Sequence, residues 1–112
     1  MLILEPPREP IDDFERTLIN AFSPLRTVHA VWIREVSVLG SHRYTRRVWL
    51  ELSLWSPEDL RTAERLVEEL KTRCISQPFY VEVEWVLGSP PRDIAPACIW
   101  RRMSVVSGSN MR

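Results

Sequence analysis

The stretch RYTRRVWLELSLWS, from Arg43 to Ser56, alternates between two kinds of side chain along its whole length. Alternate residues of a β-strand lie on opposite sides of the sheet, so the pattern predicts one strand with two different faces. The apolar face should be buried, and it consists of Tyr44, Val48, Leu50, Leu52 and Leu54. The other face consists of Arg43, Thr45, Arg47, Trp49, Glu51 and Trp55. Because Trp and Arg are enriched where proteins bind other macromolecules, this second face is the candidate interaction surface.

The residues before this stretch are predicted to form its hairpin partner. From Thr27 to Leu39, β-branched residues surround Trp32, and Gly40-Ser41 suits a two-residue turn with glycine first. On the core side the resulting register pairs Ile33 with Val48, Val31 with Leu50 and His29 with Leu52. On the outer side it pairs Trp32 with Trp49, Arg34 with Arg47 and Ala30 with Glu51.

The order of the predicted elements indicates the fold class. They are a strand over 1–5, a helix over 10–23, strands over 27–39 and 42–55, a helix from 57 to about 74 and a strand over 79–87. Ser56-Pro57 marks the second helix start, since it combines a hydroxyl cap with proline at the first helical position. This order is the split βαβ pattern of ferredoxin-like folds. We therefore expect one α+β domain over 1–102, with an antiparallel sheet, both helices on one sheet face, and a loose tail over 103–112.

Composition excludes several classes of function. The 112 residues include 15 basic and 15 acidic side chains, so no net charge attracts the chain to nucleic acid or to an anionic membrane. The two cysteines, Cys74 and Cys98, are too few and too far apart for a disulfide-rich secreted domain, and we interpret them as reduced thiols of a cytoplasmic protein. The apolar start over 1–4 is too short for a signal peptide, and no apolar run could span a bilayer.

No catalytic, cofactor or metal signature is present in the sequence. His29, His42 and the two cysteines lack the close spacing of zinc ligands, and His29 fits a hydrogen-bonded core histidine. The acidic pairs at 12–13 and 58–59 fall in first turns of helices, where the helix dipole favours them. Three scattered glycines form no phosphate loop. We therefore predict that the protein is not an enzyme and that it binds neither cofactor nor metal.

Four segments carry a resemblance to a known family. The line LILEPPREP, residues 2–10, leads into a helix containing Leu18 and Phe22 and then into VHAVW, residues 28–32. Together with CIWRR, residues 98–102, this order resembles the C-terminal domain of the bacterial enhanced-serine-sensitivity protein SseB family. The resemblance implies a bacterial, non-catalytic domain that is sometimes found near secretion or toxin loci.

The predicted function is protein binding through the open sheet face. The candidate contact residues are Trp32, Arg34, Arg43, Arg47, Trp49, Glu51, Trp55, Tyr80, Glu82 and Glu84. The expected partner is a toxin or secretion-system component, which would make the chain an immunity or adaptor protein. Alternatives are a homodimer joined through this face, or RNA binding by its aromatics, although acidic residues there disfavour phosphate. A further alternative is that Trp100 folds over the two tryptophans as a lid and converts the face into a second small core.

Overall fold

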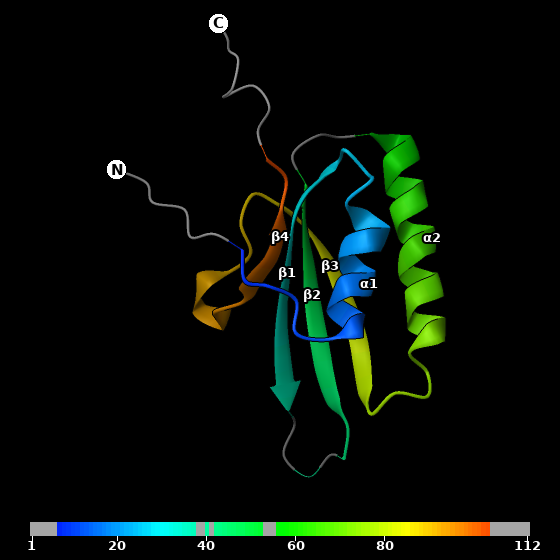
Figure 1. Ribbon diagram of the computed structural model, residues 1–112, viewed down its shortest axis with the longest axis vertical. Coiled ribbons are helices and arrows are strands. Elements are labelled where there is room, and N and C mark those ends of the chain that lie inside the picture. Colours follow the sequence, from blue (N-terminus) through cyan, green and yellow to red (C-terminus); the bar gives the residue numbers. More distant parts are fainter. Residues whose placement is uncertain (1–6, 38–39, 41, 53–55, 104–112) are drawn as a thin grey trace, which may run out of the picture.

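The computed structural model describes residues 7–37, 40, 42–52 and 56–103 (Figure 1). Its elements are α1 (Asp13–Phe22), β1 (Val28–Ser37), β2 (Tyr44–Leu52), α2 (Pro57–Arg73), β3 (Phe79–Leu87), the 3-10 turn η1 (Arg92–Ile94) and β4 (Ala97–Arg101). The predicted strand over 1–5 and the predicted tail beyond 103 lie outside the described residues. The α+β class is confirmed, and the element order is consistent with a ferredoxin-like fold.

The four described strands form one mixed sheet in the order β3-β2-β1-β4. β1 pairs antiparallel with β2 and with β4, whereas β2 and β3 run parallel. The expectation of a fully antiparallel sheet is therefore wrong. The reason is that α2 carries the chain back along the sheet between β2 and β3, so both strands point the same way. These two strands are direct neighbours, and β3 and β4 take the two edges of the described sheet.

The hairpin register is confirmed over most of its length, including the pairing of Trp32 with Trp49. Gly40 has a φ of 85°, the left-handed value that favours glycine at the first position of such a turn. Near the far end the register shifts, and Val28 rather than His29 faces Leu52. The prediction for His29 is wrong because the irregularity inserts an extra residue into β1, which turns Val28 into the core and leaves His29 half-buried.

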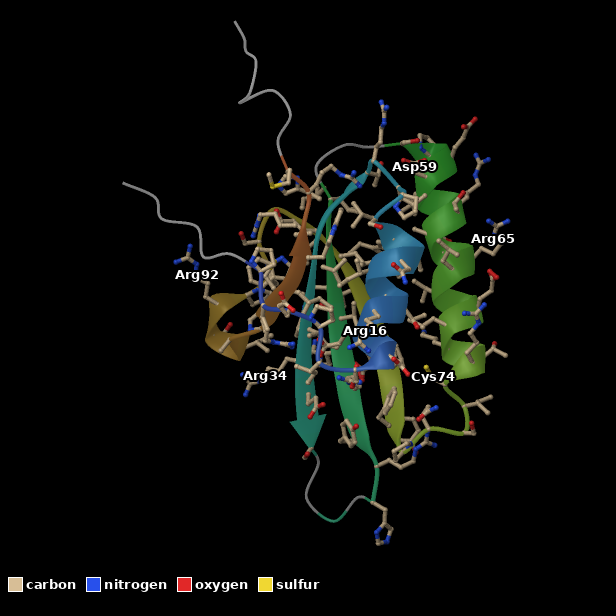
Figure 2. All side chains as sticks on the ribbon, in the orientation of Figure 1. Arg16, Arg34, Asp59, Arg65, Cys74 and Arg92 are labelled. Atoms are coloured by element: carbon tan, nitrogen blue, oxygen red, sulfur yellow. The ribbon has the colours of Figure 1, made fainter. Side chains whose placement is uncertain are left out.

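Both helices cover the same face of the sheet, as Figure 1 shows. Helix α1 is capped by Asp12, whose side chain accepts a hydrogen bond from the Glu15 backbone N–H at 3.0 Å, and α2 begins with Pro57 after the Ser56 cap. The outer side of α2 is charged, and Arg65 points away from the sheet (Figure 2). The shared core is built from one apolar stripe of each helix and the facing strand residues: Leu18, Phe22, Ala63, Val67, Leu70, Val31, Ile33, Val48 and Leu50.

The segment after η1, expected to be a short apolar island, forms the edge strand β4 beside β1. Trp100 lies opposite Val31 and packs against the core beneath the helices, so it is not a lid over Trp32 and Trp49. The next residue but one, Arg102, donates hydrogen bonds to the backbone oxygens of Ser23, Leu25 and Val28 at 2.7, 2.8 and 3.1 Å. Helix α1 has no basic residue in its last turn, and Arg102 supplies a cation at this end instead.

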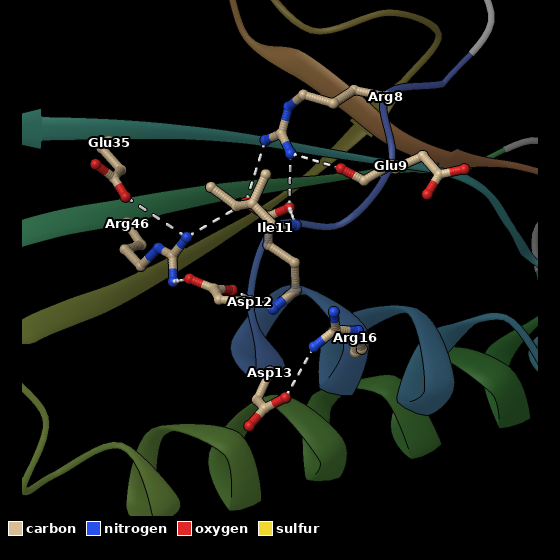
Figure 3. A network of polar contacts seen from close by, with 9 residues as sticks. Arg8, Glu9, Ile11, Asp12, Asp13, Arg16, Glu35 and Arg46 are labelled. Carbon is tan, nitrogen blue, oxygen red and sulfur yellow. Dashed lines mark hydrogen bonds and ion pairs between the residues drawn. The ribbon is translucent and has the colours of Figure 1, made fainter.

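A network of charged side chains lies under the start of α1 (Figure 3). Arg46 of β2 is only 2% exposed, and it contacts Asp12 at 2.8 Å, Glu15 at 3.3 Å and Glu35 at 3.5 Å. Glu15 is 1% exposed and also accepts two hydrogen bonds from Arg8, at 2.8 and 3.1 Å. Buried charges are costly unless they are paired, so this network fixes the position of α1 on the sheet.

Candidate interaction surface

The sheet face opposite the helices brings together most of the predicted contact residues. The strand registers place Trp32, Trp49 and Glu84 in one row across three strands. The adjacent row contains Arg34, Arg47 and Glu82. Trp55 lies outside the described residues. The sequence therefore identified neighbours correctly, but which of them are exposed depends on how each side chain packs.

Trp49 lies at the centre of this face, and it is 0% exposed. The guanidinium of Arg47 lies over its ring, 5.0 Å from the centroid, and the indole Nε1 has no acceptor among the described residues. The expectation that Trp49 is an accessible contact residue is wrong in this structure. Its strand is flanked on both sides, by β1 and β3, so the indole is enclosed by the side chains of both neighbours.

Trp32 and Glu51 are also held within the fold. The indole Nε1 of Trp32 donates to Oε1 of Glu51 at 3.0 Å, and Oε2 of Glu51 lies 3.8 Å from Nη1 of Arg101. The Arg101 guanidinium in turn lies 5.5 Å from the Trp32 ring centroid. Glu51 is buried, so its charge is balanced inside the molecule rather than offered to a partner.

Two of the predicted arginines hold connecting segments in place. Nη2 of Arg43 donates to the backbone oxygens of Gln77 and Phe79, each at 2.9 Å, and its guanidinium lies 4.0 Å from the Tyr80 ring centroid. Nη1 of Arg34 donates to the backbone oxygens of Ile94 and Ala95, beside η1. Both side chains therefore stabilise the entry into an edge strand, β3 for Arg43 and β4 for Arg34.

The exposed part of the predicted surface is concentrated on β3. Tyr80 is 52% exposed, and the side chains of Glu82 and Glu84 are 59% and 52% exposed. Arg47 reaches across from β2 and lies 2.9 Å from Glu84 and 4.0 Å from Glu82. We call these four residues the β3 strip. It is an aromatic and acidic surface on an edge strand, and it contains most of the predicted contact residues that are exposed. Arg34 of β1 is exposed as well, but its guanidinium is hydrogen-bonded to the backbone beside η1.

A separate cavity of about 500 Å³ lies on the helix side of the sheet, with Asp12, Arg46, Arg73 and Cys74 in its lining. Burial on its own would raise the pKa of Asp12, but hydrogen bonds from the Glu15 backbone N–H and from Arg46 hold that pKa below its ordinary value. Burial raises the pKa of the Cys74 thiol, so it is protonated and weakly nucleophilic at neutral pH. The cavity therefore contains paired charges and an unactivated thiol.

The described residues provide no cluster of three or more His, Cys, Asp or Glu side chains suited to a metal ion. Within the same residues, neither helix combines the length and the apolar character needed to cross a membrane. Comparisons with protein-family models, curated proteins and solved structures find no match. The resemblance to the SseB family therefore stays a prediction from the quoted residues.

Sequence reasoning missed the buried charge network, although one signal for it was present. By alternation, Arg46 falls on the same strand face as Val48 and Leu50, so the sequence pattern itself puts a charge at a core position. A charge placed there requires a buried partner. What the alternation could not show was that the partners are Glu15 and Asp12, which lie more than thirty residues away in sequence.

Proposed function

We propose that this protein is a non-catalytic protein-binding module that contacts its partner through the β3 strip. The observation that carries the proposal is the contrast between two sets of predicted residues. Trp49 and Glu51 are buried, whereas Tyr80, Glu82 and Glu84 point outward from an edge strand. Edge strands with exposed aromatic residues beside charges are suited to protein contacts.

The proposed partner is a dedicated bacterial protein, a toxin or a secretion-system component, and the chain would act as its immunity or adaptor protein in the cytoplasm. This part of the proposal rests on the resemblance to the SseB family. The acidic character of the strip favours a basic surface on that partner, because opposite charges steer association and fix orientation.

The geometry favours protein over RNA as the ligand. Single-stranded RNA is recognised by stacking its bases on exposed aromatic rings. Here the ring of Trp49 is buried, and the indole N–H of Trp32 donates a hydrogen bond to Glu51. The exposed carboxylates of Glu82 and Glu84 would in addition repel phosphate.

Co-purification from the native host tests the proposal. The variant carries Tyr80→Ala and Glu82→Lys, which alter two exposed members of the β3 strip, and the control carries Glu69→Lys on the exposed side of α2. We expect the wild type and the control to retain one specific partner and the β3 variant to lose it, with the circular dichroism spectrum unchanged. Equal recovery of the partner by all three proteins would refute the proposal.

A further inference from the structure

A groove runs along the outer edge of the sheet, between β3 and α2. It consists of two hollows of about 220 and 470 Å³, and Lys71 of α2 contributes to both. The smaller hollow is lined on the strand side by Phe79, Tyr80 and Val81, and the larger by Val83 and Trp85. Figure 1 shows α2 on the side of the sheet where β3 forms the edge.

The floor of the groove is apolar and only partly covered. Val81, Val83 and Trp85 face the helices, but each is left half-buried because no described strand lies beyond β3. Ile75, which lines the smaller hollow, is among the most exposed large hydrophobic residues of the described chain. Half-buried apolar side chains that line a groove next to an exposed one are typical of a binding surface.

Charged side chains lie on both sides of the edge strand. On the groove side, Glu64 and Glu68 line the larger hollow beside Lys71, which lies 3.9 Å from Glu68, and Arg43 lines the smaller hollow. On the opposite sheet face, the β3 strip presents the carboxylates of Glu82 and Glu84, and Arg47 contacts both. Two carboxylates thus meet one cation on this opposite face, so basic side chains of a ligand have complementary charge there.

We propose that an extended segment of the partner protein, with alternating apolar and basic side chains, adds to β3 as a further strand. This inference rests on the proposed function and names the chemistry of its ligand. An edge strand offers unpaired backbone groups to such a segment, and side chains two residues apart on one face are separated by about 7 Å. Its apolar side chains would enter the two hollows in turn, and its basic side chains, on the opposite face of the added strand, would lie beside Glu82 and Glu84.

A second copy of this chain is a poorer occupant of the same edge. A symmetric antiparallel pair of β3 strands centred on Val83 would place Glu82 of one copy directly opposite Glu84 of the other. Like charges directly opposite each other across two strands destabilise the pair. A basic segment converts the same carboxylates into favourable contacts.

Peptide binding to the purified full chain tests the inference. The probe is a fluorescein-labelled peptide of about eight residues alternating valine and lysine, with a valine–glutamate peptide and an N-methylated valine–lysine peptide as controls. Anisotropy should detect binding of the valine–lysine peptide alone, because N-methylation removes the backbone donors of the added strand. Heteronuclear NMR should place the largest shifts on β3 and on the facing side of α2.

A pair of charge-reversal variants tests the acidic face of β3. Glu84→Lys lies on the β3 strip, whereas Glu69→Lys makes the same charge change at an exposed position of α2 outside both hollows. We expect Glu84→Lys to weaken peptide binding about fivefold and Glu69→Lys to leave it unchanged, since reversing one rim charge alters affinity modestly.

Three results would overturn the inference: no binding of the valine–lysine peptide at about 1 mM, equal binding of the N-methylated peptide, or a concentration-dependent dimer with β3 protected from exchange. These results leave the proposed function standing if the Tyr80→Ala, Glu82→Lys variant still loses its co-purifying partner. Retention of that partner, in contrast, refutes the proposed function whatever the peptide does.

Discussion

Replacing Glu15 by Gln tests whether the buried charge network holds α1 in place. The Glu15 carboxylate accepts four hydrogen bonds: from the Arg8 Nη1 and Nη2 atoms at 2.8 and 3.1 Å, from the Ile11 backbone N–H at 3.2 Å and from the Arg46 Nη2 atom at 3.3 Å. Glutamine has the same shape but retains only one acceptor oxygen, and its amide N–H₂ group would face guanidinium donors.

The size of the effect follows from burial. Removing one partner of a buried ion pair costs about 3–5 kcal/mol, because the remaining charge is left uncompensated. Arg46 keeps Asp12 and Glu35 as neighbours, so we expect the lower end, a loss of about 3 kcal/mol in the free energy of unfolding. With a denaturant slope typical of a small domain, the urea midpoint should fall by about 2 M.

Urea unfolding followed by tryptophan fluorescence measures this loss directly, since the chain has five tryptophans. Asp13→Asn is the control, because Asp13 is fully exposed and its pair with Arg16 lies on the surface, so the midpoint should not move. In a double-mutant cycle, Arg46→Met combined with Glu15→Gln should cost less than the sum of the single changes. A loss below about 1 kcal/mol for Glu15→Gln would show that the network does not hold the helix.

Three further outcomes can be checked on the same protein. Arg102→Ala should lower the free energy of unfolding by about 2 kcal/mol, because it leaves backbone oxygens at the end of α1 without their cationic donor, and an unchanged urea midpoint would contradict this. The folded-state pKa of Asp12 is depressed, so its contribution to the free energy of unfolding is present above the unfolded value of 3.8 and is lost as the pH falls through the lower folded pKa. The difference in the free energy of unfolding between the wild type and Asp12→Asn, measured by urea unfolding at a series of pH values, should therefore shrink below pH 3.8. Burial raises the pKa of both Cys74 and Cys98, so a thiol-specific disulfide reagent should modify the native protein slowly at neutral pH and much faster in urea, whereas equal rates would show that the thiols are accessible.

The central hairpin was predictable because its causes are local. Alternation along β2 and a glycine turn fix the pairing of Trp32 with Trp49, and both features can be read within thirty residues of sequence. The start of α2 at Ser56-Pro57 is local in the same sense, since cap and first-turn chemistry act within one helical turn. The irregularity near His29 was not predictable, because it depends on how the end of β1 meets β2 and β4.

Of the candidate site, too, one part was predictable from local sequence and another part depended on the tertiary structure. Alternation alone placed Glu82 and Glu84 on one face of β3, and the structure has them there, exposed. Alternation also placed Trp49 on that face. Trp49 is buried because its strand, β2, has a neighbouring strand on each side, whereas β3 has a neighbour on one side only among the described strands. Strand order decides this difference, and strand order is set by long-range pairing.

The sequence by itself determined the α+β class, most of the hairpin register and the two-faced character of its strands, because each follows from the spacing of neighbouring residues. Only the tertiary structure decided that β3 is an edge, that the apolar segment after η1 becomes β4, and that Arg46 finds Glu15 beneath α1. These outcomes depend on contacts between residues far apart in the chain. Those contacts decide which side chains are buried. Burial is the reason that Arg46 needs carboxylate partners and that Trp49 belongs to the interior rather than to the surface.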